Sequence, residues 1–142
     1  MVTASHPEPG QPPRFIEAYI DGGQFGRNPT PFGIFWSVVI EGMPDSITIY
    51  SEDRSGKYKT NNEAEWMALR EVLLWAIEHV PNAALVVHSD SKHVVNCFTG
   101  KTNARTERIL RLMLECRRLA AQLPMVEMQW VPRDVSVDIL GH

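Results

Sequence analysis

The hydrophobic positions of this chain follow two periods, one typical of strands and one typical of helices. Short runs rich in β-branched and aromatic residues, each bounded by turn-forming residues, predict strands over 14–21, 33–41, 46–51, 84–88 and 125–131. Apolar residues spaced three and four apart predict helices over 62–79, 91–98 and 106–123. The predicted order is therefore three strands, a helix, a strand, two helices and a strand.

This order predicts a mixed five-stranded sheet flanked by helices, which is an α/β fold. The first three strands are joined by short connections and should form an antiparallel meander. The two strands that follow helices should pair in parallel with the first strand through right-handed crossovers. We expect one domain over 14–142. Residues 1–13 contain four prolines and few apolar side chains, so they are predicted to be a disordered lead-in.

Composition narrows the class of protein. A hydrophobic content of 44% and a charged content of 22% are those of a soluble globular domain. No apolar run approaches the roughly 20 residues of a membrane span, and no signal peptide is visible, so we expect a cytoplasmic protein. Cys97 and Cys116 fit neither a disulfide framework nor a zinc motif and are interpreted as reduced thiols. The net charge of −3 argues only weakly against nucleic-acid binding, because an acidic cluster can coexist with local basic patches.

Two aspartates stand where predicted strands end. Asp21 follows the first apolar run and precedes Gly22 and Gly23, and Asp90 follows the strand at 84–88. An Asp-Gly step alone is also an ordinary turn. If the two strands are parallel neighbours, however, the aspartates meet at one edge of the sheet and either repel or share a proton. A divalent cation resolves this conflict, and carboxylate oxygens suit Mg²⁺ or Mn²⁺.

A third carboxylate lies on the first long predicted helix, which Thr60 or Asn61 can cap. Glu65 precedes Ala68 and the following apolar positions at helical spacing, so it belongs to the buried face of the first turn. Glu63 is roughly 200° away around the helix and is expected to point to solvent. An acid in a first turn can simply complement the helix dipole. Convergence with two strand-end aspartates favours a common site.

Four short motifs occur in order on these elements: YIDGG at 19–23, TNNEAE at 60–65, HSDSKHV at 88–94 and WVPR at 130–133. Together they resemble the signatures of the type 1 ribonuclease H family, over about 15–133. The resemblance implies a ribonuclease H-like fold, which agrees with the element order predicted from the hydrophobic pattern.

The resemblance also implies an activity: hydrolysis of the RNA strand of an RNA–DNA hybrid by a two-metal mechanism, leaving 5′-phosphomonoesters. Asp21, Glu65 and Asp90 would then be catalytic ligands of Mg²⁺, with two ions bound as the resemblance implies and Mn²⁺ able to substitute. Contacts to the hybrid are expected from Gly22, Asn28, Asn61, Asn62 and Lys92. Plain helix capping is the alternative role for Asn61 and Asn62. We expect a monomer that needs no membrane.

The tail departs from the family pattern, which has a fourth acid at the opening of a C-terminal helix. We favour Asp138 as this fourth catalytic and metal ligand; Asp134 is the other candidate, and a third register places Gly141 there and leaves three carboxylates. In each register the final helix is shortened or absent. His142 could assist product departure, although the simpler interpretation is that it is only the terminal residue.

Two other functions on the same fold stay open from the sequence. One is a catalytically impaired module that only binds hybrids, and the other is a different two-metal nuclease, such as a junction resolvase or an exonuclease. Bacterial members of the resembled family often carry a basic loop that grips the DNA strand. The connection at 98–106 is short here and carries only Lys101 and Arg105, so hybrid binding is expected to be weaker and more sensitive to salt than in a version with the full loop.

Overall fold

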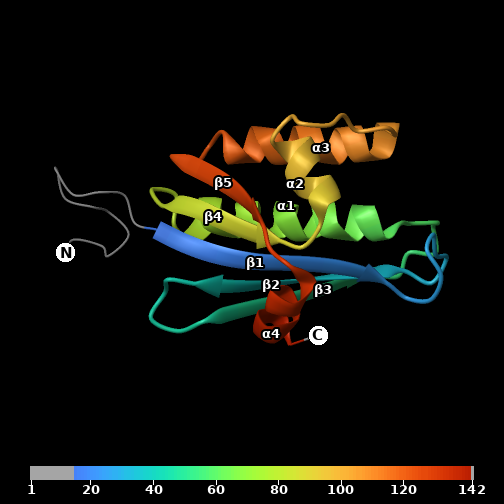
Figure 1. Cartoon of the computed structure of the whole chain (residues 1–142), viewed down its shortest axis with the longest axis horizontal. Coiled ribbons are helices and arrows are strands. Elements are labelled where there is room, and N and C mark those ends of the chain that lie inside the picture. The colour runs from blue at the N-terminus through green and yellow to red at the C-terminus, as the bar shows by residue number, and fades with distance from the viewer. Residues whose placement is uncertain (1–14, 142) are drawn as a thin grey trace, which may run out of the picture.

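The computed structural model describes residues 15–141, so the predicted lead-in at 1–13 and His142 lie outside the described residues. The strands and helices follow one another as β1 (Phe15–Gln24), β2 (Ile34–Glu41), β3 (Ile47–Asp53), α1 (Asn61–His79), β4 (Ala84–Ser89), α2 (Lys92–Phe98), α3 (Glu107–Ala120), β5 (Met125–Trp130) and α4 (Arg133–Leu140) (Figure 1). The predicted order of strands and helices is confirmed, and α4 is the short final helix.

The strands form one mixed sheet in the order β3-β2-β1-β4-β5. Strand β1 pairs antiparallel with β2 and parallel with β4, and β2–β3 and β4–β5 continue the antiparallel and parallel halves. The predicted sheet is therefore confirmed. Strand β1 lies at its centre, where the antiparallel half meets the parallel half, and its carboxyl end is next to that of β4.

Helices cover the two faces unequally (Figure 1). Helix α1 packs on β1 and β2, and α3 packs on α1. The short helix α4 lies on the opposite face, also against β1 and β2. On that face Ser37 and Val39 of β2 are buried, although they alternate with the core residues Val38 and Ile40.

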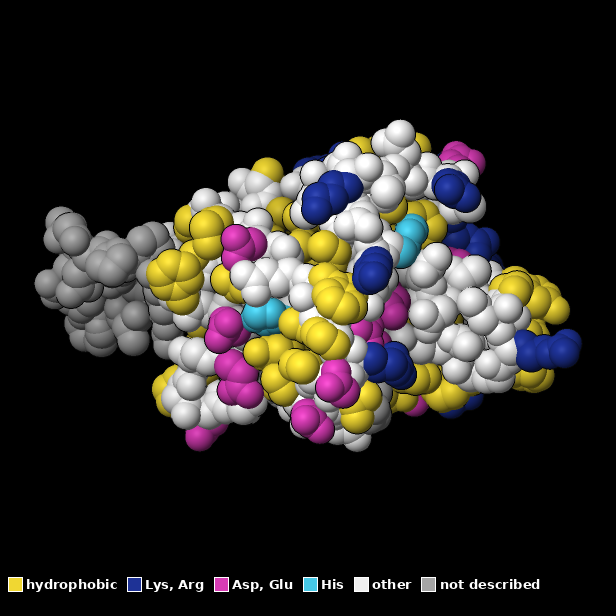
Figure 2. Space-filling model, viewed as in Figure 1, with side chains coloured by type: hydrophobic (Ala, Val, Ile, Leu, Met, Phe, Trp, Pro, Cys, Tyr) yellow, Lys and Arg dark blue, Asp and Glu magenta, His cyan; other side chains and the backbone are white. Residues whose placement is uncertain are grey.

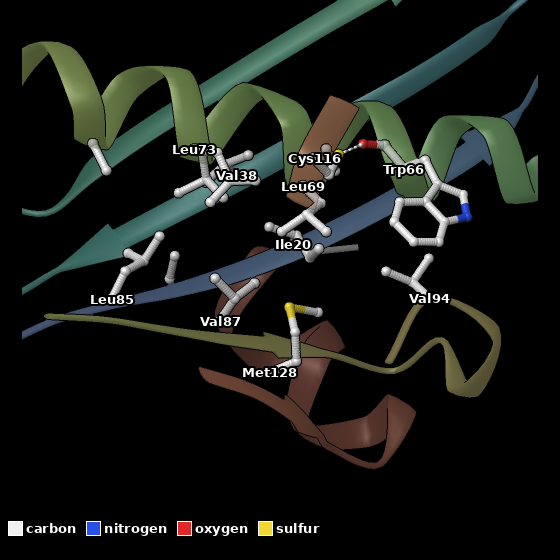
Figure 3. Packing of buried hydrophobic residues seen from close by; sticks show 14 of the residues in the cluster. Ile20, Val38, Trp66, Leu69, Leu73, Leu85, Val87, Val94, Cys116 and Met128 are labelled. Atoms are coloured by element: carbon white, nitrogen blue, oxygen red, sulfur yellow. Dashed lines mark hydrogen bonds between the residues drawn. The ribbon is translucent and has the colours of Figure 1, made fainter. Parts of the chain in front are cut away.

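The main core lies between α1 and the sheet (Figure 3). Ile20 of β1, Leu69 of α1 and Val87 of β4 are almost completely buried there. Burial of each such side chain contributes about 1.5–3 kcal/mol. This packing fixes the register of α1 on the sheet, and with it the place of the first helical turn.

A capping box begins α1. The Thr60 hydroxyl accepts a hydrogen bond from the Glu63 backbone N–H, and Glu63 Oε1 accepts one from the Thr60 backbone N–H, both at 3.2 Å. The expectation that Glu63 points to solvent was wrong, because its side chain is buried. It turns back to the cap and forms an ion pair of 2.9 Å with Arg108 of α3. Helix phase alone does not reveal such a contact.

Strand β1 is longer than predicted. Gly22 and Gly23 lie beyond the predicted strand at 14–21, but they pair with Trp36 and Phe35 of β2, so the strand continues to Gln24. Asp21 therefore lies within the strand near its carboxyl end.

Among residues 15–141, none of the helices combines the length and the apolar composition that a membrane crossing requires.

Candidate active site

Three carboxylates from three elements meet at the carboxyl ends of β1 and β4. Asp21 comes from β1, Asp90 directly follows β4, and Glu65 comes from the first turn of α1. One carboxylate oxygen from each lies within 4.8 Å of the others. The predicted meeting of the parallel strand ends follows from the pairing of Ile20 with Ser89, one residue before each aspartate.

The pKa of Glu65 is clearly shifted by burial and by the charges of its neighbours. Its side chain is 4% exposed, and Oε1 accepts a bond of 3.4 Å from the Asn61 amide. No hydrogen-bond partner is found for the buried Oε2 within the described part of the chain. Burial, followed by the charges of Asp21 and Asp90, raises the pKa of Glu65 to about 8. A buried carboxylate oxygen without a donor, beside two other acids, fits a bound cation.

Gly22 allows α1 to approach β1. A Cβ at Gly22 would lie 2.4 Å from the Ala64 carbonyl carbon and 2.5 Å from the Glu65 backbone nitrogen. The space beside the Gly22 Cα is therefore filled by the first turn of α1. The close contact places Glu65 above the carboxyl end of β1.

Arg133 was not among the predicted site residues. It opens α4, its side chain is 70% exposed, and its Nη1 lies 3.1 Å from Asp90 Oδ2. It also lines a hollow of about 390 Å³ together with Asp21, Gly22, Asn28 and Asn61. The WVPR motif was the available signal, but only the structure shows that α4 brings this guanidinium to the acids.

Two of the predicted contact residues are linked to each other. The Asn61 backbone N–H donates to Asn28 Oδ1 at 2.9 Å, which ties the β1–β2 loop to the start of α1. Thr60 is the N-cap, so Asn61 is not needed for capping. Both amides border the acidic cluster.

The other predicted contact residues, Asn62 and Lys92, are not among the residues that line the hollow beside Asp21. Asn62 is exposed and lines a second hollow of about 460 Å³ with Arg105 and Thr106, between the start of α1, α2 and the segment before α3. Lys92 is exposed at the start of α2, and its Nζ lies 5.0 Å from the centre of the Trp130 ring. Figure 2 shows basic side chains close to the acidic ones on this face of the molecule.

The candidate fourth acids stand apart from the cluster. Asp134 and Asp138 are four residues apart on α4, so they share one side of the helix, and both are exposed. The group of potential metal ligands found among the described residues contains Asp21, Glu65 and Asp90 and neither of these. Gly141 ends α4 rather than opening it. The assignment of Asp138 stays a prediction.

Neither histidine beside Asp90 is presented to the acids. His93 Nε2 lies 2.9 Å from Trp66 Nε1, from which it accepts a hydrogen bond, and burial lowers the pKa of His93. His88 stacks on Tyr19 and lies 3.1 Å from Glu17. The packing role expected for His93 agrees with these contacts.

The fold and the acidic site are those of the ribonuclease H class. The sequence pattern of a family described as Reverse transcriptase-like matches residues 37–137, and the chain belongs to this family. It is 34% identical over 118 residues to the Bifunctional protein Rv2228c of Mycobacterium tuberculosis. That match covers 83% of this chain but only 31% of the longer relative.

Solved structures agree with this assignment. The N-terminal RNase H domain of Rv2228c, solved as a fusion with maltose-binding protein, has a TM-score of 0.74 at 27% identity and covers 88% of this chain and 87% of that one. RNase H1 from Halobacterium salinarum NRC-1 has a TM-score of 0.73 at 25% identity, covering 86% and 89%. LC11-RNase H1 in complex with an RNA/DNA hybrid has a TM-score of 0.73 over 87% and 90%, and at 22% identity it shows the fold alone.

Proposed function

We propose that this chain is an endonuclease that requires Mg²⁺, with Mn²⁺ as a substitute, and hydrolyses the RNA strand of RNA–DNA hybrids to 5′-phosphomonoesters. The observation that carries the proposal is the cluster of Asp21, Glu65 and Asp90, with ligand atoms within 4.8 Å and one buried oxygen without a partner. An all-oxygen donor set of this kind suits hard divalent cations.

The residues fit a pair of such ions, which would be held by the three carboxylates and by Asp138 if its assignment is right. When bound, they would supply an activated water nucleophile and charge stabilisation for the departing 3′ oxygen. The three carboxylates are held by β1, by α1 and by the residue after β4, so their negative charges are fixed at the carboxyl ends of β1 and β4. Arg133, beside Asp90, provides a further cation that a phosphate of the cleaved strand can approach.

Selection of the RNA strand is assigned to the amides beside the acids. Asn28 and Asn61 border the hollow that contains Asp21, and their amide groups can both donate to and accept from a 2′-hydroxyl. The buried Gly22 backbone forms part of the same wall. On the far side of the α1 start, Asn62 and Arg105 line a second hollow suited to a phosphate of the other strand. Lys92 adds a cation near Trp130.

The proposal is tested by offering one labelled substrate at a time with Mg²⁺ or with EDTA. An RNA–DNA hybrid, single-stranded RNA, double-stranded RNA, duplex DNA and a four-way DNA junction form the panel. We expect cleavage of the RNA in the hybrid alone, and only with Mg²⁺. Asp21→Asn should lower the rate by about a hundredfold or more, because it removes fixed charge from the site. Asp45→Asn, in the β2–β3 turn, is the matched control and should leave the rate unchanged.

Each other result points to a different function. Binding of the hybrid without cleavage would indicate a binding module. Cleavage of the DNA junction or of DNA ends, with the hybrid intact, would indicate a resolvase or an exonuclease. Either result would refute the proposed activity.

A further inference from the structure

Two exposed aromatic rings stand together at the end of the molecule that carries the β1–β2 loop. Phe32 is 64% exposed and Tyr58 is 62% exposed, which are the two largest exposed fractions among the large hydrophobic side chains of residues 15–141. With Arg27, Asn28, Pro29 and Pro31 they line one hollow of about 540 Å³. Figure 2 shows hydrophobic and basic side chains together at this end.

The walls of this aromatic hollow are held in place by hydrogen bonds. Thr30 and Lys59 exchange two backbone hydrogen bonds, of 2.9 and 3.1 Å, which join the β1–β2 loop to the segment before α1. The Phe32 backbone N–H donates to the Thr30 hydroxyl at 3.0 Å. Arg108 Nη1 donates to the Tyr58 carbonyl at 2.8 Å. The two rings are therefore presented by ordered backbone.

The chemistry of the hollow favours a nucleotide. Aromatic faces stack on nucleobases whatever their sequence, and a guanidinium pairs with phosphate. Arg27 is the only charged residue among those lining the aromatic hollow, so no carboxylate opposes a phosphate there. The neighbouring hollow between β3, α1 and α3 differs, because Asp53, Glu63 and Glu115 accompany its basic residues.

The aromatic hollow adjoins the candidate active site. Asn28 lines both this hollow and the one that contains Asp21. A strand lying over Asn28 and Asn61 would reach Phe32 and Tyr58 if it continued past them. Bases inside a duplex already stack on their neighbours, so only an unpaired or terminal base presents a face to an aromatic ring.

We propose that Phe32, Tyr58 and Arg27 bind an unpaired nucleotide of a strand that continues beyond the RNA–DNA hybrid. This inference rests on the proposed function, because it takes the hybrid to lie over Asp21, Asn28 and Asn61. The protein thereby recognises the junction between a hybrid and a single strand, in addition to the hybrid itself.

The test compares one hybrid with blunt ends and the same hybrid with a short single-stranded extension on each strand end in turn. Affinity is measured by fluorescence anisotropy in EDTA, with the full chain. We expect one of the extensions to tighten binding about tenfold over the blunt hybrid. Phe32→Ala and Tyr58→Ala should each remove most of this gain and leave the affinity for the blunt hybrid unchanged. Phe15→Ala, at the far end of β1 and 58% exposed, is the matched control and should keep the gain.

Three results would overturn the inference. They are equal affinity for blunt and extended hybrids, an equal loss for both in the Phe32 and Tyr58 variants, and the same loss in Phe15→Ala. Thermal unfolding of each variant shows that the fold is intact. Cleavage of the blunt hybrid with Mg²⁺ is scored separately, so cleavage without a preference for extensions refutes only this inference. A preference without cleavage supports it and refutes only the proposed activity.

Discussion

At the scale of single residues, Glu65 makes the metal-free protein sensitive to pH. Its pKa is raised from 4.5 to about 8, so between these values the folded chain holds a proton that the unfolded chain has lost. Stability contributed by the protonated form is complete below pH 4.5 and is lost as the pH rises through 8. The metal-free protein should therefore become less stable across this interval.

Glu65→Gln should remove this pH dependence. An amide of similar shape carries no charge, so at pH 8 the metal-free variant should melt about 4 °C above the wild type. Melting temperatures measured in EDTA from pH 5 to 9 check the prediction. A variant that keeps the slope of the wild type would show that Glu65 is not the titrating group. The same change should abolish cleavage of the hybrid, because it removes a ligand.

Arg133 is expected to contribute to substrate binding. Arg133→Gln removes one cation beside Asp90, so KM for the hybrid should rise about tenfold, and the slope of log affinity against log salt should fall by about one. Steady-state kinetics and a salt titration measure both effects. Arg118→Gln, on the exposed side of α3, is the matched control and should change neither. An unchanged salt slope in Arg133→Gln would exclude a phosphate contact.

The sequence indicated the three clustered acids but not their surroundings. Asp21 and Asp90 were predictable because parallel strand ends meet, and Glu65 because its helix phase placed it inward. The burial of Glu63 could not be predicted, because its orientation depends on the capping box and on Arg108, which is distant in sequence. Arg133 was missed because its place depends on how α4 packs.

At the scale of elements, the contact between β1 and α1 positions Glu65. Gly22→Ala would bring a Cβ within 2.4 Å of the α1 backbone, which cannot move without displacing the helix. We expect a loss of about 1–3 kcal/mol in stability together with reduced cleavage, measured by denaturant unfolding and by initial rates.

Gly23→Ala is the comparison for this prediction. Its Cβ would meet the Phe35 ring, a side chain that can rotate away, so the loss of stability should be smaller. A larger effect at Gly23 than at Gly22 would contradict the assigned role of the β1–α1 contact.

Both candidates for the fourth carboxylate, Asp134 and Asp138, lie on helix α4. The assignment made from the sequence predicts that Asp138→Asn lowers the cleavage rate about tenfold, whereas Asp134→Asn, one turn earlier on the same side of α4, leaves it unchanged. Rates at saturating Mg²⁺ measure this difference. Full activity of Asp138→Asn would leave three carboxylates as the complete site.

At the scale of the whole molecule, the order and pairing of the strands were readable from the hydrophobic pattern. Three consecutive strands with short connections form an antiparallel meander. Strands that are connected through helices pair in parallel, as β4 does with β1 and β5 does with β4. The ends of the strands and helices were harder to predict. Strand β1 continues through Gly22 and Gly23 because β2 provides pairing partners for them, and the local sequence does not show these partners. The hollows beside Asn28 and Asn62 also depend on loops that come together only in the fold.

Asp21, Glu65 and Asp90 are proposed to form one centre for divalent cations. A crystal soaked in Mn²⁺ tests it directly, because anomalous scattering locates each ion. We expect Mn²⁺ bound by oxygens of all three carboxylates, with Glu65 Oε2 among the ligands, and no such signal in crystals of Asp21→Asn. Mn²⁺ bound elsewhere, with the three carboxylates free of metal at saturating concentration, would contradict it.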